Sequence, residues 1–342
     1  MLRKSANPFL LISLALVLVL AFTNCEKLKI SNLQANNYFN KANEFFTDGQ
    51  YRRAIEMYEK ALIYNPNLVQ AYRFLGESYK NLYKPGVDNP DNTEKAKRAL
   101  DALRKAYEID PHNKDVIYSL GDMYDKLRNF EEAEKLYLRI LEMEPTDMGN
   151  YNVAAQFYQR YASGTDEVSE TGEKTPFKKA EDMYLRRIEL DPESMEGYAF
   201  IAQFYDIAVN VSSNPAPLFD KAIIYHDLRL KDDPENAEAL LAKGVNRWGK
   251  AHRLQNILSI EEQKKLAEES YEALQKAMEI DPSYPEPYAW MSVLNRSLRA
   301  RLEPEKASRY TTEADQYIAK FQEAKKRQAE TRRLEQELRG IR

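Results

Sequence analysis

Hydrophobic residues recur at helical spacing along most of the chain, and the pattern is broken at regular intervals by proline. Each of these prolines follows an acidic residue or asparagine, at Asn65-Pro66, Asp110-Pro111, Glu144-Pro145, Asp191-Pro192, Asp233-Pro234 and Asp281-Pro282. Because the residue before proline is forced out of the α region, each dipeptide predicts the end of a helix. We expect the proline itself to lie in the opening turn of the next helix, where its missing N–H costs nothing.

The predicted helices form pairs, and each helix of a pair carries one small residue where the two must cross. First helices supply Ala42, Gly76, Gly121, Ala155, Ala202 and Gly244, and second helices supply Ala54, Ala99, Ala133, Ala180, Ala222 and Ser270. Large aromatic side chains, including Tyr58, Tyr124 and Tyr205, stand one helical turn away. We therefore predict that most tyrosines fill the core between stacked helix pairs and do not form a binding surface.

This pattern resembles the tetratricopeptide-repeat family. Residues 51–62 resemble its second helix, Leu75, Gly76 and Tyr79 match its first helix, and the spacing between Pro111 and Pro145 equals its 34-residue unit. The resemblance implies an all-α fold, a right-handed α-solenoid of about six helix-turn-helix repeats plus a half repeat and a long C-terminal capping helix. The repeats are placed at 35–68, 69–113, 114–147, 148–194, 195–236 and 237–284, followed by the half repeat 285–302 and the capping helix with its basic tail, 303–342.

Two features of the sequence depart from that family. Late in the second helix the family prefers alanine, but Ile140, Arg187 and Arg229 occupy this position, so we expect altered packing among the third, fourth and fifth repeats. Four repeats also carry extra residues between their two helices, at 81–93, 162–175, 209–218 and 250–265. We expect these insertions to gather along one edge of the solenoid, since insertions in repeat proteins often mark a binding face.

The start of the chain has the pattern of a secretory signal. Arg3 and Lys4 precede the apolar run 9–22, which is shorter than the ~20 residues of a membrane-spanning helix. The run is followed by Cys25, the only cysteine. This arrangement resembles bacterial lipoprotein precursors, although Phe22 and Asn24 differ from their usual residues.

That second resemblance implies a signal peptide at 1–24, a lipidated Cys25, a short linker at 25–34 and a location in the bacterial cell envelope. Glu26, in place of an aspartate, favours the outer membrane, with the periplasmic or surface side left open. An uncleaved N-terminal anchor and ordinary signal cleavage remain as alternatives.

Composition excludes several classes of function. The net charge of -4 provides no positive field for nucleic acid, and one cysteine with three scattered histidines gives no metal-ligand spacing. No phosphate-binding loop, HExxH or GxSxG motif is present. We therefore expect a protein that is not an enzyme and that needs no cofactor or metal.

The remaining candidate for a functional site is a groove lined by exposed residues of the first helices. These are Asn43, Arg73, Glu77, Tyr118, Asp122, Asp125, Asn152, Gln156, Gln159, Gln203, Asp206 and Trp248. Amides and acids in its centre suit an extended peptide backbone or a basic segment. The hypothesis is an envelope-anchored scaffold that binds protein or peptide partners through the groove and the insertions, for example in envelope or secretion-machine assembly.

Two other functions compete with this hypothesis. A lipoprotein that captures glycans or nutrients is one, although such proteins usually carry a large non-repeat region that this sequence lacks. A cytoplasmic co-chaperone is the other, but of the Lys and Asn residues in the family's dicarboxylate clamp only Asn43 has a match. The sequence leaves the oligomeric state open.

Overall fold

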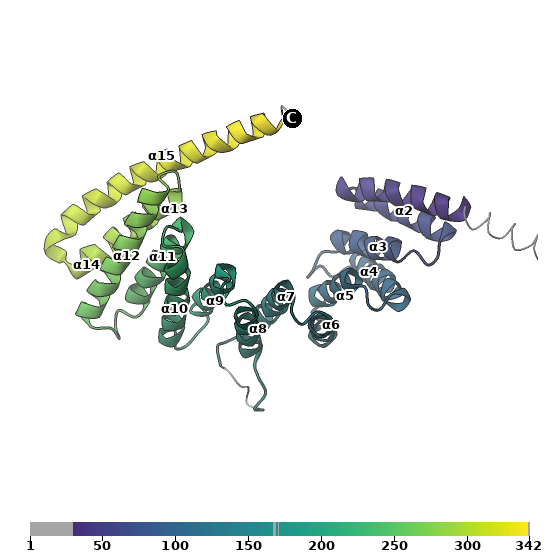
Figure 1. Ribbon diagram of the computed structural model, residues 1–342, viewed down its shortest axis with the longest axis horizontal. Coiled ribbons are helices and arrows are strands. Elements are labelled where there is room, and N and C mark those ends of the chain that lie inside the picture. Colours follow the sequence, from purple (N-terminus) through teal and green to yellow (C-terminus); the bar gives the residue numbers. More distant parts are fainter. Residues whose placement is uncertain (1–29, 167–168, 170, 341–342) are drawn as a thin grey trace, which may run out of the picture. The chain divides into compact units, whose positions relative to one another are not determined.

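The computed structural model describes residues 30–166, 169 and 171–340, and helices dominate this part of the chain (Figure 1). No β-strand occurs among these residues, so the all-α prediction is confirmed. The signal peptide and Cys25 lie outside the described residues. Residues 30–34, which the sequence assigns to a linker, are helical and belong to the first helix, 30–47.

The helices fall into two compact units, and the chain passes from the first to the second between Asn150 and Tyr151. After the first helix, unit 1 contains α2 (Tyr51–Tyr64), α3 (Val69–Leu82), α4 (Pro90–Ile109), α5 (Lys114–Lys126) and α6 (Phe130–Met143). Helix α7 (Met148–Tyr161) spans this division of the chain. Unit 2 continues with α8 (Pro176–Leu190), α9 (Met195–Ala208), α10 (Ala216–Asp232), α11 (Ala237–Arg253), α12 (Ile260–Ile280), α13 (Pro285–Leu294) and α15 (Ala307–Gly340).

Every second helix ends where the sequence predicts, but the prolines lie elsewhere than expected. Helix α2, for example, ends at Tyr64, directly before Asn65-Pro66, and α3 begins only at Val69. The amide of Leu68 donates to the carbonyl of Asn65 at 3.2 Å, and the equivalent bond recurs after each of the other five dipeptides. Proline therefore occupies the second position of a β-turn, for which its fixed φ is suited, and not the first helical turn.

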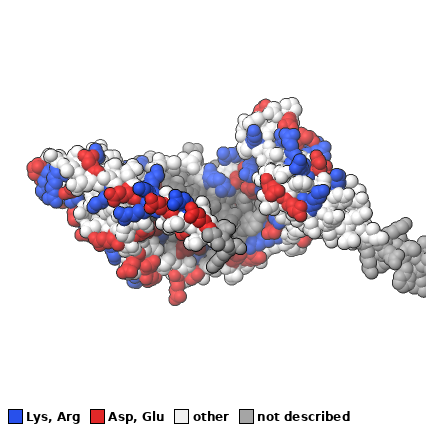
Figure 2. Space-filling view, turned by 90° about the horizontal axis from the view of Figure 1, so that it is seen from above, with Lys and Arg blue, Asp and Glu red and all other residues white. Residues whose placement is uncertain are grey.

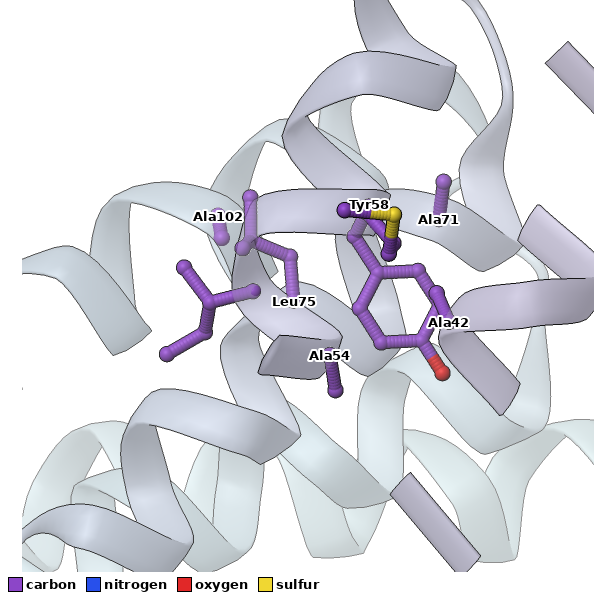
Figure 3. Packing of buried hydrophobic residues seen from close by; sticks show 8 residues of the cluster. Ala42, Ala54, Tyr58, Ala71, Leu75 and Ala102 are labelled. Carbon is purple, nitrogen blue, oxygen red and sulfur yellow. The ribbon is translucent and has the colours of Figure 1, made fainter. Parts of the chain in front are cut away.

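The close helix crossings are confirmed by burial of the small residues. Ala42, Ala54 and Ala71 are fully buried around Tyr58 and Leu75 in unit 1 (Figure 3). A Cβ on Gly76 would lie 2.5 Å from Cγ of Leu103, so the neighbouring helix leaves no room for a side chain there. In unit 2 the crossing includes a hydrogen bond, because Ser270 Oγ donates to the carbonyl of Gly244 at 2.7 Å.

The insertions are shorter as loops than the sequence suggests, because several of their residues extend the flanking helices. Helix α12 already begins at Ile260, where Ser259 and Glu262 form a capping box that satisfies free amides of the first turn. Within unit 2 the inserted segments approach one another, as expected. Thr165 and Ser212 share a hydrogen bond of 2.9 Å, and Arg253 donates to Asn210 at 2.8 Å.

The last helices form a further hairpin. Helix α13 continues through a π-helical segment (Asn295–Arg299) and α14 (Ala300–Leu302), and a 3-10 turn (Pro304–Lys306) leads into α15. Tyr310, Ala314 and Ala324 of α15 are buried. The side chains of α15 after Gln328 are exposed as far as they are described. The basic tail is thus a solvated helix with i,i+4 ion pairs such as Arg333–Glu337.

No helix within the described ranges is both long enough and apolar enough to cross a lipid bilayer.

Candidate functional site

Three of the predicted groove residues in unit 1 are engaged in ion pairs with neighbouring side chains. Lys80 Nζ donates to Asp122 at 2.6 Å and to Glu77 at 2.9 Å. Burial disfavours the ammonium, but the two carboxylates outweigh it and raise the pKa of Lys80. Arg73 lies 3.5 Å from Asp115 and stacks on the Phe74 ring. These charges therefore stabilise contacts between α3 and α5.

Two more unit 1 candidates take part in packing through hydrogen bonds. Asn43 Oδ1 accepts from the Tyr58 hydroxyl at 2.7 Å, and the Tyr118 hydroxyl donates to Asn150 Oδ1 at 2.7 Å. Asp125, on α5, is half-buried. The unit 1 candidates thus lie on first helices of the repeats, but their side chains already have partners within the protein.

In unit 2, four candidates border two hollows on either side of α9. We call them the apolar hollow, about 390 Å³, and the polar hollow, about 470 Å³. The apolar hollow is lined by Gln156, Gln159, Arg160, Ala162, Gly164, Phe177, Phe204, Ile207, Ala208 and Val211. The polar hollow is lined by Met195, Glu196, Ala199, Phe200, Gln203, Asp206, His226, Arg229, Asp233, Asn236, Glu238 and Ala242.

The apolar hollow lies between α7 and α9 and is bordered by two of the insertions. Phe177 and Phe204 are buried and stack with ring centroids 5.0 Å apart, which gives the hollow a rigid floor. Ile207 is 48% exposed and Val211 55% exposed at its edge. An exposed apolar edge above a buried aromatic floor is suited to an apolar side chain of a ligand.

Behind this floor, a buried carboxylate joins three helices. Glu181 of α8 is 2% exposed and accepts from Lys178 at 2.6 Å, Lys221 at 2.7 Å and the Tyr205 hydroxyl at 2.7 Å. Burial opposes its ionised form, but these hydrogen bonds outweigh burial and lower the pKa of Glu181. The network fixes the position of α9 between the two hollows.

The polar hollow lies between α9 and α11, with α10 behind it. Asp206 accepts from His226 Nε2 at 2.7 Å and from Asn246 Nδ2 at 2.6 Å. Arg229 is buried, and its Nη2 lies 3.8 Å from Glu238 Oε1, which is too long for a hydrogen bond. Desolvation by burial lowers the pKa of Arg229 despite the nearby carboxylates.

Arg229 has a counterpart in the preceding repeat. Arg187 occupies the equivalent position late in α8, and each arginine is followed by a glutamate in the first turn of the next helix, Glu196 or Glu238. Arg187 Nη2 donates to Glu196, and its guanidinium lies 4.9 Å from the Phe200 ring centroid. Its Nε and Nη1 are fully buried, whereas Arg229 lines the polar hollow.

The last two candidates, Asn152 and Trp248, line neither hollow. Trp248 is half-buried, stacks on His252 and contacts Trp290, and its Nε1 donates to Ser297 at 2.9 Å. Its indole is therefore part of the packing between α11 and α13. Asn152 is half-buried on α7.

Sequence reasoning missed His226 and Arg229 as site residues. Arg229 did carry a signal, since a charged residue stood where the family has alanine, but this predicted only altered packing. His226 had none, because a single histidine on a second helix is indistinguishable from a core residue.

A third hollow, about 590 Å³, lies in unit 1 and was not predicted. It is lined by α4, α5 and α6, and its residues include Arg104, Tyr107 and Arg139. Arg104 Nε donates to the Tyr124 hydroxyl at 3.0 Å, and Arg139 Nη2 donates to the carbonyl of Pro111 at 2.9 Å. Since these arginines have partners in the protein, the hollow is a weaker candidate.

Charge and metal-ligand arrangements add no further site. On the face drawn in Figure 2, Lys and Arg side chains are interspersed with Asp and Glu. Across the described segments, no group of three or more His, Cys, Asp or Glu residues is placed to hold a metal ion.

Comparison with known proteins identifies the repeat. Models described as tetratricopeptide repeat match residues 39–79, 93–160 and 251–284, so the chain contains tetratricopeptide repeats. No catalytic family is among these matches. No curated protein sequence matches the chain.

A solved structure shows the same fold, and other solved structures align less well. The C-terminal part of a tetratricopeptide-repeat-containing protein from Cytophaga hutchinsonii aligns with a TM-score of 0.55 at 14% identity, covering 82% of this chain and 93% of that one. A tetratricopeptide repeat protein from Parabacteroides merdae aligns with a TM-score of 0.47 at 13% identity, covering 86% of this chain and 98% of that one. The first such domain of Spaghetti (RPAP3), bound to an HSP90 peptide, aligns with a TM-score of 0.33 at 24% identity, covering 39% and 96%.

Proposed function

We propose that this tetratricopeptide-repeat chain is a non-enzymatic interaction scaffold, anchored to the bacterial cell envelope, which binds an extended segment of a partner protein on unit 2. The observation that carries the proposal is the pair of hollows on either side of α9. The apolar hollow has an aromatic floor, and the polar hollow is lined by charged and amide side chains. Tetratricopeptide repeats generally serve protein interaction, which is consistent with this use.

The dimensions of α9 favour an extended segment over a folded surface. A helix with its side chains is about 10 Å wide, and an extended chain advances about 3.3 Å per residue. A segment that crosses α9 would therefore place two residues, about three positions apart, in the two hollows. Gln203 and Asp206 lie on the polar side of this crossing, and Ile207 lies on the apolar side.

Site-specific photocrosslinking in intact cells tests partner binding. A photoreactive phenylalanine at Gln203 should give one discrete adduct, which mass spectrometry identifies. The control position is Ile224, which is exposed on α10 and lines neither hollow. The same adduct should disappear when Ile207→Asp places a charge at the edge of the apolar hollow. An adduct that is equal at both positions, or unaffected by Ile207→Asp, would contradict the proposal.

Envelope anchoring rests on the sequence around Cys25 alone. If a lipid is attached there, Cys25→Ala should move the protein from the membrane fraction to the soluble fraction, and metabolic labelling with an alkyne fatty acid should be lost. Multiple acyl chains would give a stable anchor, whereas a single chain binds membranes only marginally. Unchanged fractionation of Cys25→Ala, or wild-type protein without label, would refute the lipid anchor. Neither result would affect partner binding at unit 2.

A further inference from the structure

The guanidinium of Arg229 is the one polar group lining the two hollows that combines near-complete burial with no hydrogen bond to a described residue. Arg229 is 9% exposed, and its closest carboxylate oxygen, on Glu238, is 3.8 Å away. Glu238 itself is 79% exposed, so it gains little from this contact. The Arg229 nitrogens are not among the fully buried atoms that lack a partner, so they stay open to the polar hollow, where an acceptor of a ligand can replace water.

We infer that Arg229 is a specificity-determining residue of unit 2, and that it donates to an uncharged amide oxygen of the bound segment while an apolar side chain of that segment occupies the apolar hollow. This inference rests on the proposed function and names the chemistry that the polar hollow accepts. The amide oxygen has two possible sources, a main-chain carbonyl and the side chain of Asn or Gln.

The charges around Arg229 argue for an uncharged acceptor over a carboxylate. Asp206, Asp233 and Glu238 all line the polar hollow with it. Asp206 accepts hydrogen bonds from His226 and Asn246, and Glu196 accepts one from Arg187. Neither carboxylate therefore needs a cation from the ligand. A further carboxylate would be placed among like charges, which is unfavourable, whereas an amide oxygen brings no net charge.

Arg187 provides a matched control within the same protein. It occupies the equivalent position one repeat earlier, is 5% exposed and is followed by an equivalent glutamate. Its Nε and Nη1 atoms have no accessible surface, and Arg187 does not line the polar hollow. Removing the Arg187 guanidinium unpairs Glu196, but that carboxylate is 67% exposed and stays solvated, so only the Arg229 substitution removes a donor from the polar hollow.

The test starts from a random dodecapeptide library displayed on phage and selected on the full chain. The tightest selected peptide is synthesised with a fluorophore, and its dissociation constant is measured by fluorescence anisotropy for wild type, Arg229→Met, Arg229→Lys, Arg187→Met and Ile207→Asp. Circular dichroism melting shows whether each variant is folded. A hydrogen bond from a charged donor corresponds to about a tenfold to hundredfold change in affinity.

We expect Arg229→Met to weaken binding by this factor, Arg229→Lys to weaken it less, and Arg187→Met to leave it within about twofold of wild type. Replacing the peptide residue about three positions from the apolar anchor with Asp or Glu should also weaken binding. If only an Asn or Gln at that position resists replacement by Ala, the side chain supplies the amide oxygen. If Ala is tolerated there, the main chain supplies it.

Different outcomes would contradict the role of Arg229 and the proposed function. Equal losses in Arg229→Met and Arg187→Met, no loss in either, or a peptide that requires a carboxylate at the second position would overturn the role of Arg229 and leave the proposed function standing. Recovery of no binding peptide, or of peptides indifferent to Ile207→Asp, would count against the proposed function itself.

Discussion

Adding one methyl group at each of two equivalent glycines should have opposite effects on stability. Gly76 and Gly121 both lie inside first helices of unit 1, at the crossing with the second helix. A Cβ on Gly76 would lie 2.5 Å from Leu103 Cγ and 3.1 Å from the Ala99 carbonyl oxygen. A Cβ on Gly121 would meet the Tyr137 ring at 3.4 Å, which is ordinary contact.

The magnitudes follow from two opposing effects. Alanine is favoured over glycine in a helix by about 1 kcal/mol, and this gain applies to both positions. Overpacking a filled core costs about 1–3 kcal/mol. Leu103 is fully buried, so it has no open space to move into. We therefore expect Gly121→Ala to raise the free energy of unfolding by up to about 1 kcal/mol. The free energy of unfolding of Gly76→Ala should be about 1–3 kcal/mol lower than that of Gly121→Ala.

Urea unfolding followed by far-UV circular dichroism measures this difference, and hydrogen exchange of the α3 and α4 amides localises it. Local exchange is needed because arrays of repeats do not always unfold in one step. Both substitutions change the unfolded chain in the same way, so unfolded-state effects cancel in the comparison. Equal stability of the two variants, or a more stable Gly76→Ala, would refute the packing argument.

A double-mutant cycle isolates the cause. Leu103→Ala removes the two side-chain atoms that a Cβ on Gly76 would meet most closely, and by itself should cost about 2–5 kcal/mol. In that background Gly76→Ala should lose most of its cost, since only the helix preference and the 3.1 Å contact with the Ala99 carbonyl oxygen remain. The coupling free energy between the two positions should equal the part of the overpacking cost that comes from Leu103. Strict additivity would show that the contact with Leu103 is not the source of the penalty.

Three further outcomes are expected. Because the folded state lowers the pKa of Glu181, the ionised carboxylate stabilises the fold above the unfolded-state pKa, and this stabilisation is lost as pH falls through the folded-state pKa. Glu181→Gln should therefore destabilise the protein at pH 7 and have no effect in acid, as measured by urea titration at both pH values. Truncation after Gln328 should leave the melting temperature nearly unchanged, whereas Tyr310→Ala, at a buried ring, should cost about 3–5 kcal/mol. Ser259→Ala should cost about 0.5–2 kcal/mol by thermal unfolding, because it removes a capping box.

The sequence by itself determined the helices and their pairing. The residue before proline and the small residues at the crossings act over one or two helical turns, so their effects can be deduced without knowing the fold. The position of proline was predicted wrongly for a local reason as well. Asn65-Pro66 and its equivalents suit a β-turn as well as a helix start, and the turn is the conformation adopted.

Only the tertiary structure decided which polar residues are available to a ligand. Lys80 is paired with Asp122 from the next repeat, and Trp248 is covered by Trp290, through contacts between residues more than 40 positions apart. Arg187 and Arg229 have the same place in the repeat pattern, yet only Arg229 faces a hollow. A repeat specifies what each helix presents, but the packing of neighbouring repeats determines whether a side chain finds a partner inside the protein or remains open to one outside it.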